Sequence, residues 1–289
     1  MRKEPDTLKF AVIIPTFNEE KYLQLCLDSL VNQSLQPKYI IVVDDSSTDN
    51  TSAIIKKYED SNENISYIYN SSESTHQPGS KVIRAFYKGL GSINLSDIDI
   101  ICKFDADLIF PVNYIEELNN SFTHNKKLGL CGGRCSILKN GIWQIESLTN
   151  NDHIRGALKA YRKTAFKDIN GLAQQMGWDT ADEIKLRYNN WQIEANLELE
   201  VKHLKPTGNT YSKSYYDKQG KVFYALRYGF LLMCVAAIKM GLKRDSLKGI
   251  FKIITSYLTS NGTNYLLTFD EGKYLRKYRW QQIKKKFSL

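Results

Sequence analysis

The sequence lacks the marks of several common protein classes. Its cysteines form no Cys-x-x-Cys pair, and no neighbouring histidines complete a zinc site around Cys131 and Cys135. We therefore expect reduced, unbridged thiols, as in a cytoplasmic protein. The first residues lack the apolar core of a signal peptide, and no stretch reaches the roughly 18 consecutive apolar residues of a membrane span.

Two glycine-rich nucleotide motifs are missing as well. No G-x-G-x-x-G follows the first predicted strand, which disfavours dinucleotide binding by the usual route. No G-x-x-x-x-G-K-[S/T] occurs either, which disfavours a P-loop nucleotide hydrolase. We find no internal repeat or low-complexity tract, so 289 residues predict one large domain or a domain with an appendage.

Net positive charge is confined to the end of the chain. Residues 202–289 carry 18 lysines and arginines against four acidic residues, a net charge of +14. Because the whole chain is only +9, residues 1–201 have a net charge of −5. This asymmetry predicts an acidic body that binds cations and a basic tail that meets an anionic partner.

Apolar runs typical of strands alternate with segments of helical periodicity in the first half of the chain. The predicted strands are residues 10–15, 39–43, 65–69 and 98–104. The predicted helices begin near Asn18, which would be an N-cap, near Thr48 and near Lys81. This alternation predicts an α/β fold with a Rossmann-like, mostly parallel sheet flanked by helices.

The second half of the chain changes character beyond about residue 206. Residues 178–189 predict a helix, and residues 222–240 predict a long helix that is apolar on one side. Residues 273–286 interleave basic residues with Tyr274, Tyr278 and Trp280. We therefore divide the chain into an N-terminal α/β domain, residues 1–210, and a C-terminal amphipathic, basic helical extension, residues 211–289.

Two of the predicted strands end in paired carboxylates. Asp44 and Asp45 follow the second strand, and Asp105 and Asp107 follow the fourth as Asp-Ala-Asp. Ligands of open α/β sheets bind beyond the carboxyl ends of the strands, where such acids can hold a divalent cation. Acidic residues are also common in turns, so the Asp-Ala-Asp pair alone leaves both interpretations open.

Longer motifs resemble the family 2 glycosyltransferases. They are Ala11-Val-Ile-Ile-Pro-Thr-Phe-Asn-Glu-Glu, Leu27-Asp-Ser-Leu-Val-Asn-Gln, and Ile41-Val-Val-Asp-Asp-Ser-Ser-Thr-Asp-Asn-Thr. The resemblance covers roughly residues 8–210. It implies the GT-A fold, a nucleotide-diphosphate sugar as donor, and inversion at the anomeric carbon.

The resemblance also implies roles for residues near the first two strands. Pro15, Thr16 and Phe17 belong to the loop that resembles the family's wall for the nucleotide base. Glu19 either serves the ribose or begins the helix. Asp44 resembles the carboxylate that accepts a hydrogen from the base ring, and Asp45 is expected to brace the loop.

A metal site is implied at the Asp-Ala-Asp motif, the family's DXD motif. Asp107 resembles the direct ligand of Mg²⁺ or Mn²⁺, and Asp105 resembles a contact to the ribose or to the metal's surroundings. His203 either joins the metal or phosphate site or is structural. Hard oxygen ligands and a divalent cation suit the charge that develops on a leaving pyrophosphate.

Further residues are candidates on the phosphate and acceptor sides. Lys81 and Arg84 either face the phosphates or belong to a solvated helix face. Arg155 and Gly156 begin a segment that resembles the loop and strand of the family's acceptor side.

The catalytic base is expected in residues 177–187, which resemble the family's acidic motif. Inverting transfer requires one carboxylate to accept the proton of the attacking hydroxyl. We favour Asp182, followed by Glu183 and then Asp179. The family's usual Glu-Asp pair is absent here, so the choice among these three acids stays open; in a helix they would share a face.

The basic tail favours an anionic membrane surface, ahead of a solvated helix, and nucleic acid is not an expected partner. We therefore predict a metal-dependent, hexosyltransferase-type enzyme, peripheral at the cytoplasmic face of the membrane, that acts on a glycan or lipid-linked acceptor. The alternatives are a sugar-phosphate nucleotidyltransferase and a catalytically silent scaffold for glycan assembly. A nucleotidyltransferase normally has a glycine-rich loop after its first strand, and this chain lacks one. The intact acidic motifs argue against a catalytically silent scaffold.

Overall fold

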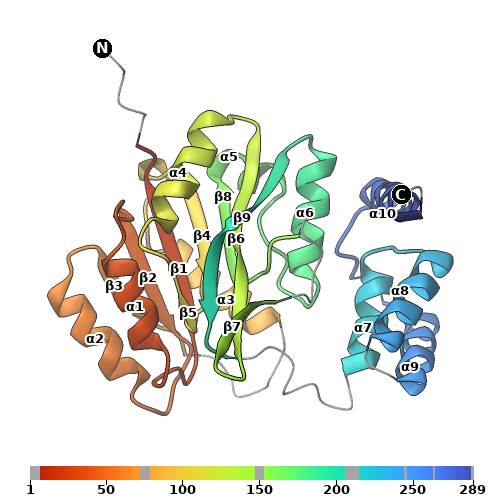
Figure 1. Cartoon of the computed structure of the whole chain (residues 1–289), viewed down its shortest axis with the longest axis horizontal. Helices are drawn as coiled ribbons and strands as arrows, with labels where there is room; N and C mark the ends of the chain where they lie inside the picture. Colours follow the sequence, from red (N-terminus) through yellow and green to blue (C-terminus); the bar gives the residue numbers. More distant parts are fainter. Residues whose placement is uncertain are drawn as a thin grey trace. The chain divides into compact units, whose positions relative to one another are not determined.

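The chain forms two compact units, which are described here separately (Figure 1). The computed structural model describes residues 7–71, 79–146, 153–205, 215–243, 246–262 and 264–287. Unit 1 comprises Met1–Gln175 and Asn189–Pro206, and unit 2 comprises Met176–Tyr188 and Thr207–Leu289. The domain boundary predicted at residue 210 lies outside the described residues.

Unit 1 is built on a nine-stranded sheet with the order β3-β2-β1-β4-β8-β6-β9-β5, and β7 pairs with β6 (Figure 1). Strand β1 is parallel to β2 and β4, and β2 is parallel to β3, whereas β8 runs antiparallel to β4 and β6. The strands are β1 Phe10–Thr16, β2 Tyr39–Asp44, β3 Ile65–Tyr69, β4 Ile100–Phe104, β5 Leu108–Ile109, β6 Leu128–Lys139, β7 Ile142–Ile145, β8 Leu158–Arg162 and β9 Gln192–His203.

Helices flank this sheet, as the alternating pattern predicted. Those of unit 1 are α1 Leu23–Val31, α2 Thr51–Ser61, α3 Ser80–Leu90, α4 Tyr114–His124 and α5 Lys163–Asp168, with a short 3-10 turn at Leu95–Asp97. Strands β1, β2 and β4 are almost entirely buried, which is why they read as continuous apolar runs rather than alternating ones.

The prediction that Asn18 caps the first helix is wrong. Asn18 has a left-handed backbone conformation with φ of 53°, and helix α1 begins only at Leu23. The Asn18 side chain instead accepts a hydrogen bond from the Thr48 amide at 2.8 Å. Asparagine tolerates this backbone region, so the residue joins the loops after β1 and β2 instead of starting a helix.

Unit 2 is helical. It contains α6 Trp178–Tyr188, α7 Tyr215–Ala225, α8 Phe230–Leu242, α9 Leu247–Leu258 and α10 Phe269–Phe287. Helix α6 matches the helix predicted at residues 178–189. Helices α6 and α10 pack together through aromatic and cationic groups, with the Tyr188 and Tyr274 rings 5.9 Å apart and the Arg187 guanidinium 5.3 Å from the Tyr278 ring.

The single long helix predicted for residues 222–240 is instead two helices, α7 and α8. The chain breaks between them at Arg227 and Gly229, which have φ of 55° and 74°. The break is held by hydrogen bonds, because Arg276 donates to the Arg227 carbonyl at 2.6 Å and Arg227 donates to the Leu267 carbonyl at 2.8 Å. Among the described residues, no helix has the length and apolar character needed to cross a bilayer.

Helix α3 approaches the sheet closely at Gly89. A Cβ atom there would lie 2.8 Å from a methyl group of Ile13 and 2.8 Å from one of Val43, both β-branched core residues. The glycine therefore sets the distance between α3 and the β1–β2 pair.

We predict that Gly89→Ala lowers the free energy of unfolding by about 1–3 kcal/mol, because overpacking outweighs the gain in helix propensity. Gly91→Ala is the matched control, since its Cβ would meet only carbonyl oxygens of Tyr87 and Lys88, at 3.3 and 3.7 Å. Urea unfolding of the two variants measures the difference. Equal midpoints for both variants would contradict the close packing at Gly89.

Candidate functional site

The two acids of the Asp-Ala-Asp motif lie directly beyond strand β4. The Asp105 amide donates to the Ala157 carbonyl at 2.8 Å, and its carboxylate forms an ion pair with Lys103, which is buried within β4. The Asp105 side chain is partly exposed, whereas that of Asp107 is buried. The motif thus presents one accessible carboxylate and one enclosed carboxylate at the same sheet edge.

His203 reaches Asp107 through a strand pairing. Strand β5 is antiparallel to the end of β9, so Leu108 is opposite His203. The Leu204 amide donates to the Asp107 carbonyl at 2.9 Å, and His203 Nε2 lies 3.3 Å from Asp107 Oδ2. Residues nearly one hundred positions apart are therefore joined by both backbone and side chain.

Lys205 connects this pair to the first loop. Its ammonium group donates to Glu19 and lies 5.7 Å from the centre of the Tyr22 ring. Glu19, Asp105, Asp107, His203 and Lys205 together form what we call the acidic corner.

Two acids of the acidic corner, Asp107 and Glu19, have pKa values shifted in opposite directions. Burial raises the pKa of Asp107, but the hydrogen bond from His203 and the charges of His203 and Lys205 outweigh it, so the pKa lies below its usual range. Burial raises the pKa of Glu19 above its ordinary value despite the hydrogen bond from Lys205. Asp107 is thus held ionised, while Glu19 carries its charge less readily.

The acidic corner contains buried oxygen atoms that suit a divalent cation. Asp107 Oδ1 and Glu19 Oε2 have no hydrogen-bond partner among the described residues, although both are buried. A buried carboxylate oxygen normally has a partner, and a cation would satisfy this requirement. The carboxylates of Asp107 and Asp105 are the hard oxygen donors that Mg²⁺ and Mn²⁺ prefer, so these residues fit such an ion.

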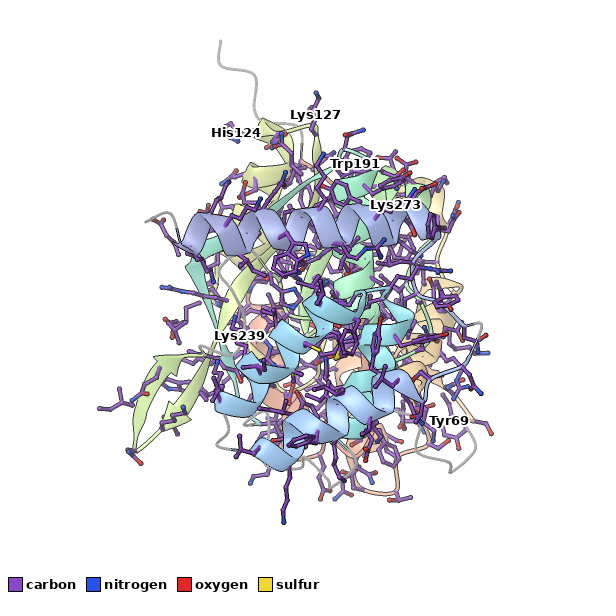
Figure 2. All side chains as sticks on the ribbon, turned by 90° about the vertical axis from the view of Figure 1, so that its right-hand side faces the viewer. Tyr69, His124, Lys127, Trp191, Lys239 and Lys273 are labelled. Atoms are coloured by element: carbon purple, nitrogen blue, oxygen red, sulfur yellow. The ribbon has the colours of Figure 1, made fainter. Side chains whose placement is uncertain are left out.

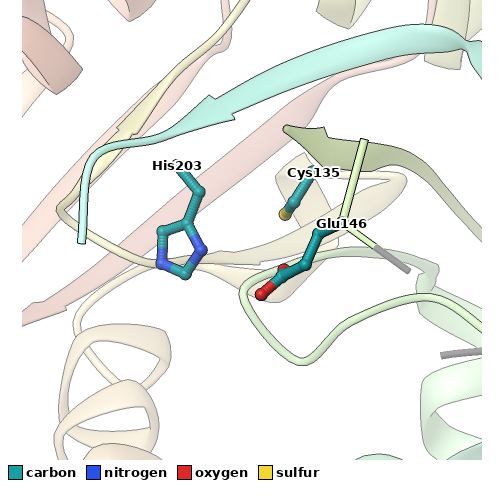
Figure 3. A group of neighbouring side chains, drawn as sticks. All are labelled: Cys135, Glu146 and His203. Atoms are coloured by element: carbon teal, nitrogen blue, oxygen red, sulfur yellow. The ribbon is translucent and has the colours of Figure 1, made fainter. Parts of the chain in front are cut away.

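A second group of possible metal ligands adjoins this one. Cys135, Glu146 and His203 place one ligand atom each within 4.8 Å of the others, and Figure 3 shows the three side chains converging. Burial raises the pKa of the Cys135 thiol to about 12, and the Glu146 carboxylate forms an ion pair with Arg155. A protonated thiol and a paired carboxylate are poor ligands for Mg²⁺, so the oxygen atoms around Asp107 fit that ion better.

The acids after strand β2 hold the loop that follows it. Asp44 is buried, and its carboxylate accepts hydrogen bonds from the Ser47 amide at 2.9 Å, from Ser52 and from Tyr67 at 3.3 Å. Asp45 accepts one from the Asn70 side chain at 2.6 Å. The bracing role expected of Asp45 is therefore shared by Asp44.

The other residues predicted to bind the sugar donor lie in unit 1, and they differ in burial. Thr16 is buried, with its hydroxyl bonded to the Val43 carbonyl at 3.0 Å, whereas Phe17 is exposed beside it. Pro15 is half-buried within β1. Lys81 and Arg84 lie in the first turns of α3, where Lys81 is half-buried and Arg84 is exposed.

Arg155 and Gly156 lie in the loop before β8. Arg155 is largely buried, and its guanidinium meets Glu146, which follows β7. The adjacent Ala157 carbonyl accepts the hydrogen bond from Asp105. This loop is therefore tied to the acidic corner by a backbone hydrogen bond.

The three candidate bases lie on helix α6, which belongs to unit 2. Asp182 and Glu183 are buried, and Asp179 in the first turn is half-buried. Asp182 Oδ1 accepts a hydrogen bond from the Glu183 amide at 2.7 Å, and Glu183 lies 3.9 Å from Arg187 on the next turn. Buried carboxylates of this kind are unusual in a helix without a functional or ion-pairing role.

Several residues around the acidic corner were not among the candidates predicted from the sequence. A signal existed for Lys103, since a lysine inside an apolar strand run two positions before an acid suggests a buried ion pair. Lys205 was visible only as part of a generally basic tail. Cys135 and Glu146 had no local signal, because they meet through pairing of β6 with β7 and β9.

The sequence matches the family described as glycosyl transferase family 2 over residues 11–170. The poly(ribitol-phosphate) beta-N-acetylglucosaminyltransferase TarS of Staphylococcus aureus is 50% identical over 54 residues, which are 18% of this chain and 9% of TarS. The GalNAc(5)-diNAcBac-PP-undecaprenol beta-1,3-glucosyltransferase of Campylobacter jejuni is 33% identical over 73 residues, covering 25% of this chain and 24% of that one. The chain thus spans less than a quarter of either relative.

Solved structures share the fold. TarS residues 1–349 in complex with UDP-GlcNAc align with a TM-score of 0.58 and 20% identity, covering 87% of this chain and 72% of that chain. A mannosyltransferase from Pyrobaculum calidifontis in complex with GDP-Man and Mn²⁺ aligns with a TM-score of 0.56 and 15% identity, covering 94% and 87%. These likenesses confirm the expected GT-A type α/β fold.

The burial of four cysteines generates a prediction about thiol reactivity. All five cysteines are free thiols, but burial raises the pKa of Cys131 and Cys135 to about 12 and also raises those of Cys26 and Cys102. At pH 8 only about one in ten thousand thiols with a pKa near 12 is ionised, and only the thiolate reacts.

We therefore expect one fast-reacting thiol per native chain, the half-exposed Cys234, when a chromogenic disulfide reagent is added. Cys234→Ser should remove the fast phase, and unfolding should release all the remaining thiols. A fast phase that persists in Cys234→Ser would show that one of the buried cysteines is accessible.

Proposed function

The chain belongs to glycosyl transferase family 2, and from this premise we propose that it transfers a sugar from a nucleotide-diphosphate sugar to an acceptor hydroxyl with inversion. The observation that carries the proposal is the acidic corner beyond β4. It combines an ionised, enclosed Asp107, a partly exposed Asp105 and an adjacent Lys205. Carboxylates for a cation beside a lysine for phosphate suit a pyrophosphate group.

The donor's cation is proposed at Asp107. Mg²⁺ or Mn²⁺ held there would stabilise the negative charge of the departing nucleoside diphosphate. Asp105 would steady the ribose or the metal's surroundings, and His203 would orient the Asp107 carboxylate through its 3.3 Å contact. The free oxygen of Asp107 supports this assignment, because its other oxygen is already engaged by His203.

The nucleoside is proposed to lie against the loops after β1 and β2. Phe17 is exposed where a base could stack, and Glu19 keeps one oxygen without a hydrogen-bond partner among the described residues. Asp44 remains the proposed acceptor from the base ring. The Asp44 carboxylate already accepts three hydrogen bonds, whereas that of Asp45 accepts one from Asn70, so Asp45 is the alternative acceptor. Lys81 and Arg84 are proposed on the phosphate side.

The transfer requires one proton acceptor. The acceptor hydroxyl oxygen forms a bond to C1 of the sugar, the bond from C1 to the phosphate oxygen breaks, and the hydroxyl proton passes to a carboxylate. We propose Asp182 as that base, with Glu183 and Asp179 as alternatives. Arg155 and Gly156 are proposed to line the acceptor side.

The acceptor is proposed to be a lipid- or polymer-linked glycan. The names of the relatives support this class, since one acts on poly(ribitol-phosphate) and another on an undecaprenol-linked saccharide. We further propose a cytoplasmic catalytic domain, residues 1–210, and a basic extension that keeps the protein peripheral at the inner face of the membrane.

We predict that Asp107→Asn weakens manganese-dependent binding of the nucleoside diphosphate by about tenfold or more, because the cation loses a charged ligand. Titration calorimetry with UDP, GDP, CDP and dTDP identifies the preferred nucleotide and measures the loss. Asp60→Asn, an exposed acid at the end of α2, is the control for the change in charge. Metal-independent binding that is equal in both variants would refute the proposed ion site.

We predict that Asp182→Asn keeps donor binding but lowers kcat by about a hundredfold to ten-thousandfold, the usual contribution of a general base. Because Asp182 is buried, thermal unfolding is measured alongside to separate lost chemistry from lost structure. Glu183→Gln and Asp179→Asn are matched comparisons on the same helix. Full transfer by Asp182→Asn would reassign the base to whichever of these two variants is inactive.

A further inference from the structure

Helix α8 is apolar on the side that faces solvent. Leu231, Val235, Ile238 and Leu242 are all exposed, and their spacing of four, three and four residues aligns them in one stripe. The opposite side of the helix is also apolar and is buried. A helix that is apolar on both its buried and its exposed side normally lies within a core or a membrane, so the exposed stripe of α8 requires an explanation.

Helix α9 repeats the arrangement. Leu247, Phe251 and Leu258 are exposed at spacings of four and seven residues, while Gly249 and Ile253 are buried on the other side. The exposed fraction is 71% for each of Leu231, Leu247 and Phe251. Single exposed leucines are ordinary, but aligned stripes on two consecutive helices form a continuous surface.

The two stripes face the same side. Four residues connect α8 to α9, a length typical of antiparallel neighbours, and the helices meet where Gly241 faces Ile250. At 100° per residue, the centre of each stripe lies about a quarter turn around its own helix axis from this contact, and the turn has the same sense in both helices. Because the helices run in opposite directions, both quarter turns lead to the same side. We call this surface the hairpin face; Figure 2 shows unit 2 from the side on which Lys239 of α8 is visible.

Lysines line the hairpin face. Lys239 and Lys243 lie about 70–110° around α8 from its stripe, and Lys248 and Lys252 lie at similar angles on α9. Lys252 also lies 3.5 Å from Asp217 of α7. Burial lowers the pKa of Lys239, and the charges of Lys286, Lys243 and Arg279 lower it further. Cations are therefore crowded at the border of the apolar stripes.

This pattern fits one class of partner. A second copy of the chain would bring lysine rows against lysine rows, and such like-charge contacts oppose association. An anionic lipid surface accepts both features, because leucine and phenylalanine side chains enter the acyl boundary while lysines extend their amines to the phosphates.

We propose that the α8–α9 hairpin lies in the interface of an anionic bilayer, with the hairpin face directed into the lipid. The inference deepens the proposed function, on which it rests for a lipid-linked acceptor. It also places the membrane contact on α8 and α9 instead of the basic segment 273–286. The aromatic residues Tyr274 and Tyr278 of that segment pack against Tyr188 and Arg187 within unit 2.

The test is co-sedimentation of the full chain with vesicles of phosphatidylcholine, with and without about 30% phosphatidylglycerol. We expect the unaltered chain to sediment with the anionic vesicles. A variant combining Leu231→Ser, Leu242→Ser, Leu247→Ser and Phe251→Ser should reduce the partition coefficient on the order of tenfold or more. Equal sedimentation of the two proteins would overturn the proposal.

The matched control is Leu138→Ser with Ile142→Ser, two exposed apolar residues on the β6–β7 ribbon. This variant should sediment as the unaltered chain does, and an equal loss of binding would overturn the assignment to the hairpin. Lys248→Gln with Lys239→Gln should weaken binding to anionic vesicles only. Sedimentation that depends on these lysines but not on the four serine substitutions would also overturn it, since headgroup attraction alone would then suffice.

Two further measurements distinguish lipid binding by the hairpin from dimerisation and from the proposed transferase function. Analytical ultracentrifugation without lipid should show a monomer, and a dimer that the four serine substitutions dissociate would identify a second copy as the occupant. Nucleoside diphosphate binding should be unchanged in the four-serine variant. An unaltered chain that binds vesicles but no nucleotide would refute the proposed function and leave the hairpin proposal standing.

Discussion

The acidic corner depends on a very short strand pairing. Two residues, Leu108 and Ile109, pair with the end of β9 and thereby bring His203 beside Asp107 and Lys205 beside Glu19. Without this pairing Asp107 would lose the hydrogen bond from His203 and the charges of His203 and Lys205, which hold its pKa below its usual range against the effect of burial. The contact therefore lets an acid that follows a strand keep its charge in an enclosed place, as the proposed cation ligand requires.

In the same corner each lysine or arginine side chain is paired with an acid other than Asp107. Lys103 neutralises part of Asp105, Lys205 neutralises part of Glu19, and Arg155 meets Glu146. Each basic residue is bound to a different acid, which leaves Asp107 Oδ1 as an oxygen that no basic group occupies. An arrangement of this kind tolerates a divalent ion together with a diphosphate, because the added charges nearly cancel.

Much of the fold follows from patterns local in sequence. Strands β1 to β4 were predicted within two residues. Strands β1, β2 and β4 were readily recognised because burial on both faces leaves uninterrupted apolar runs. The break between α7 and α8 was missed because it depends on Arg276, which lies 49 residues away and bonds to the Arg227 carbonyl. In the site, the acids of the Asp-Ala-Asp motif were visible, whereas Cys135 and Glu146 meet His203 only through strand pairing. Short motifs in the sequence reveal candidate residues, but the pairing of strands that are distant in sequence determines which of these residues become neighbours.

The path of the chain through its two units has a practical consequence. Helix α6, with all three candidate bases, is flanked on both sides by segments of unit 1 yet belongs to unit 2, where it packs against α10. Shortening the chain at residue 210 would therefore leave α6 behind without its packing partner. Such a protein would lose both the extension and the packing that holds the candidate bases on α6. If it were inactive, the result would not test whether the extension binds a membrane. Because the proposed bases lie on a helix that packs against the extension, point substitutions can test the two proposed roles separately, whereas cutting the chain would remove both.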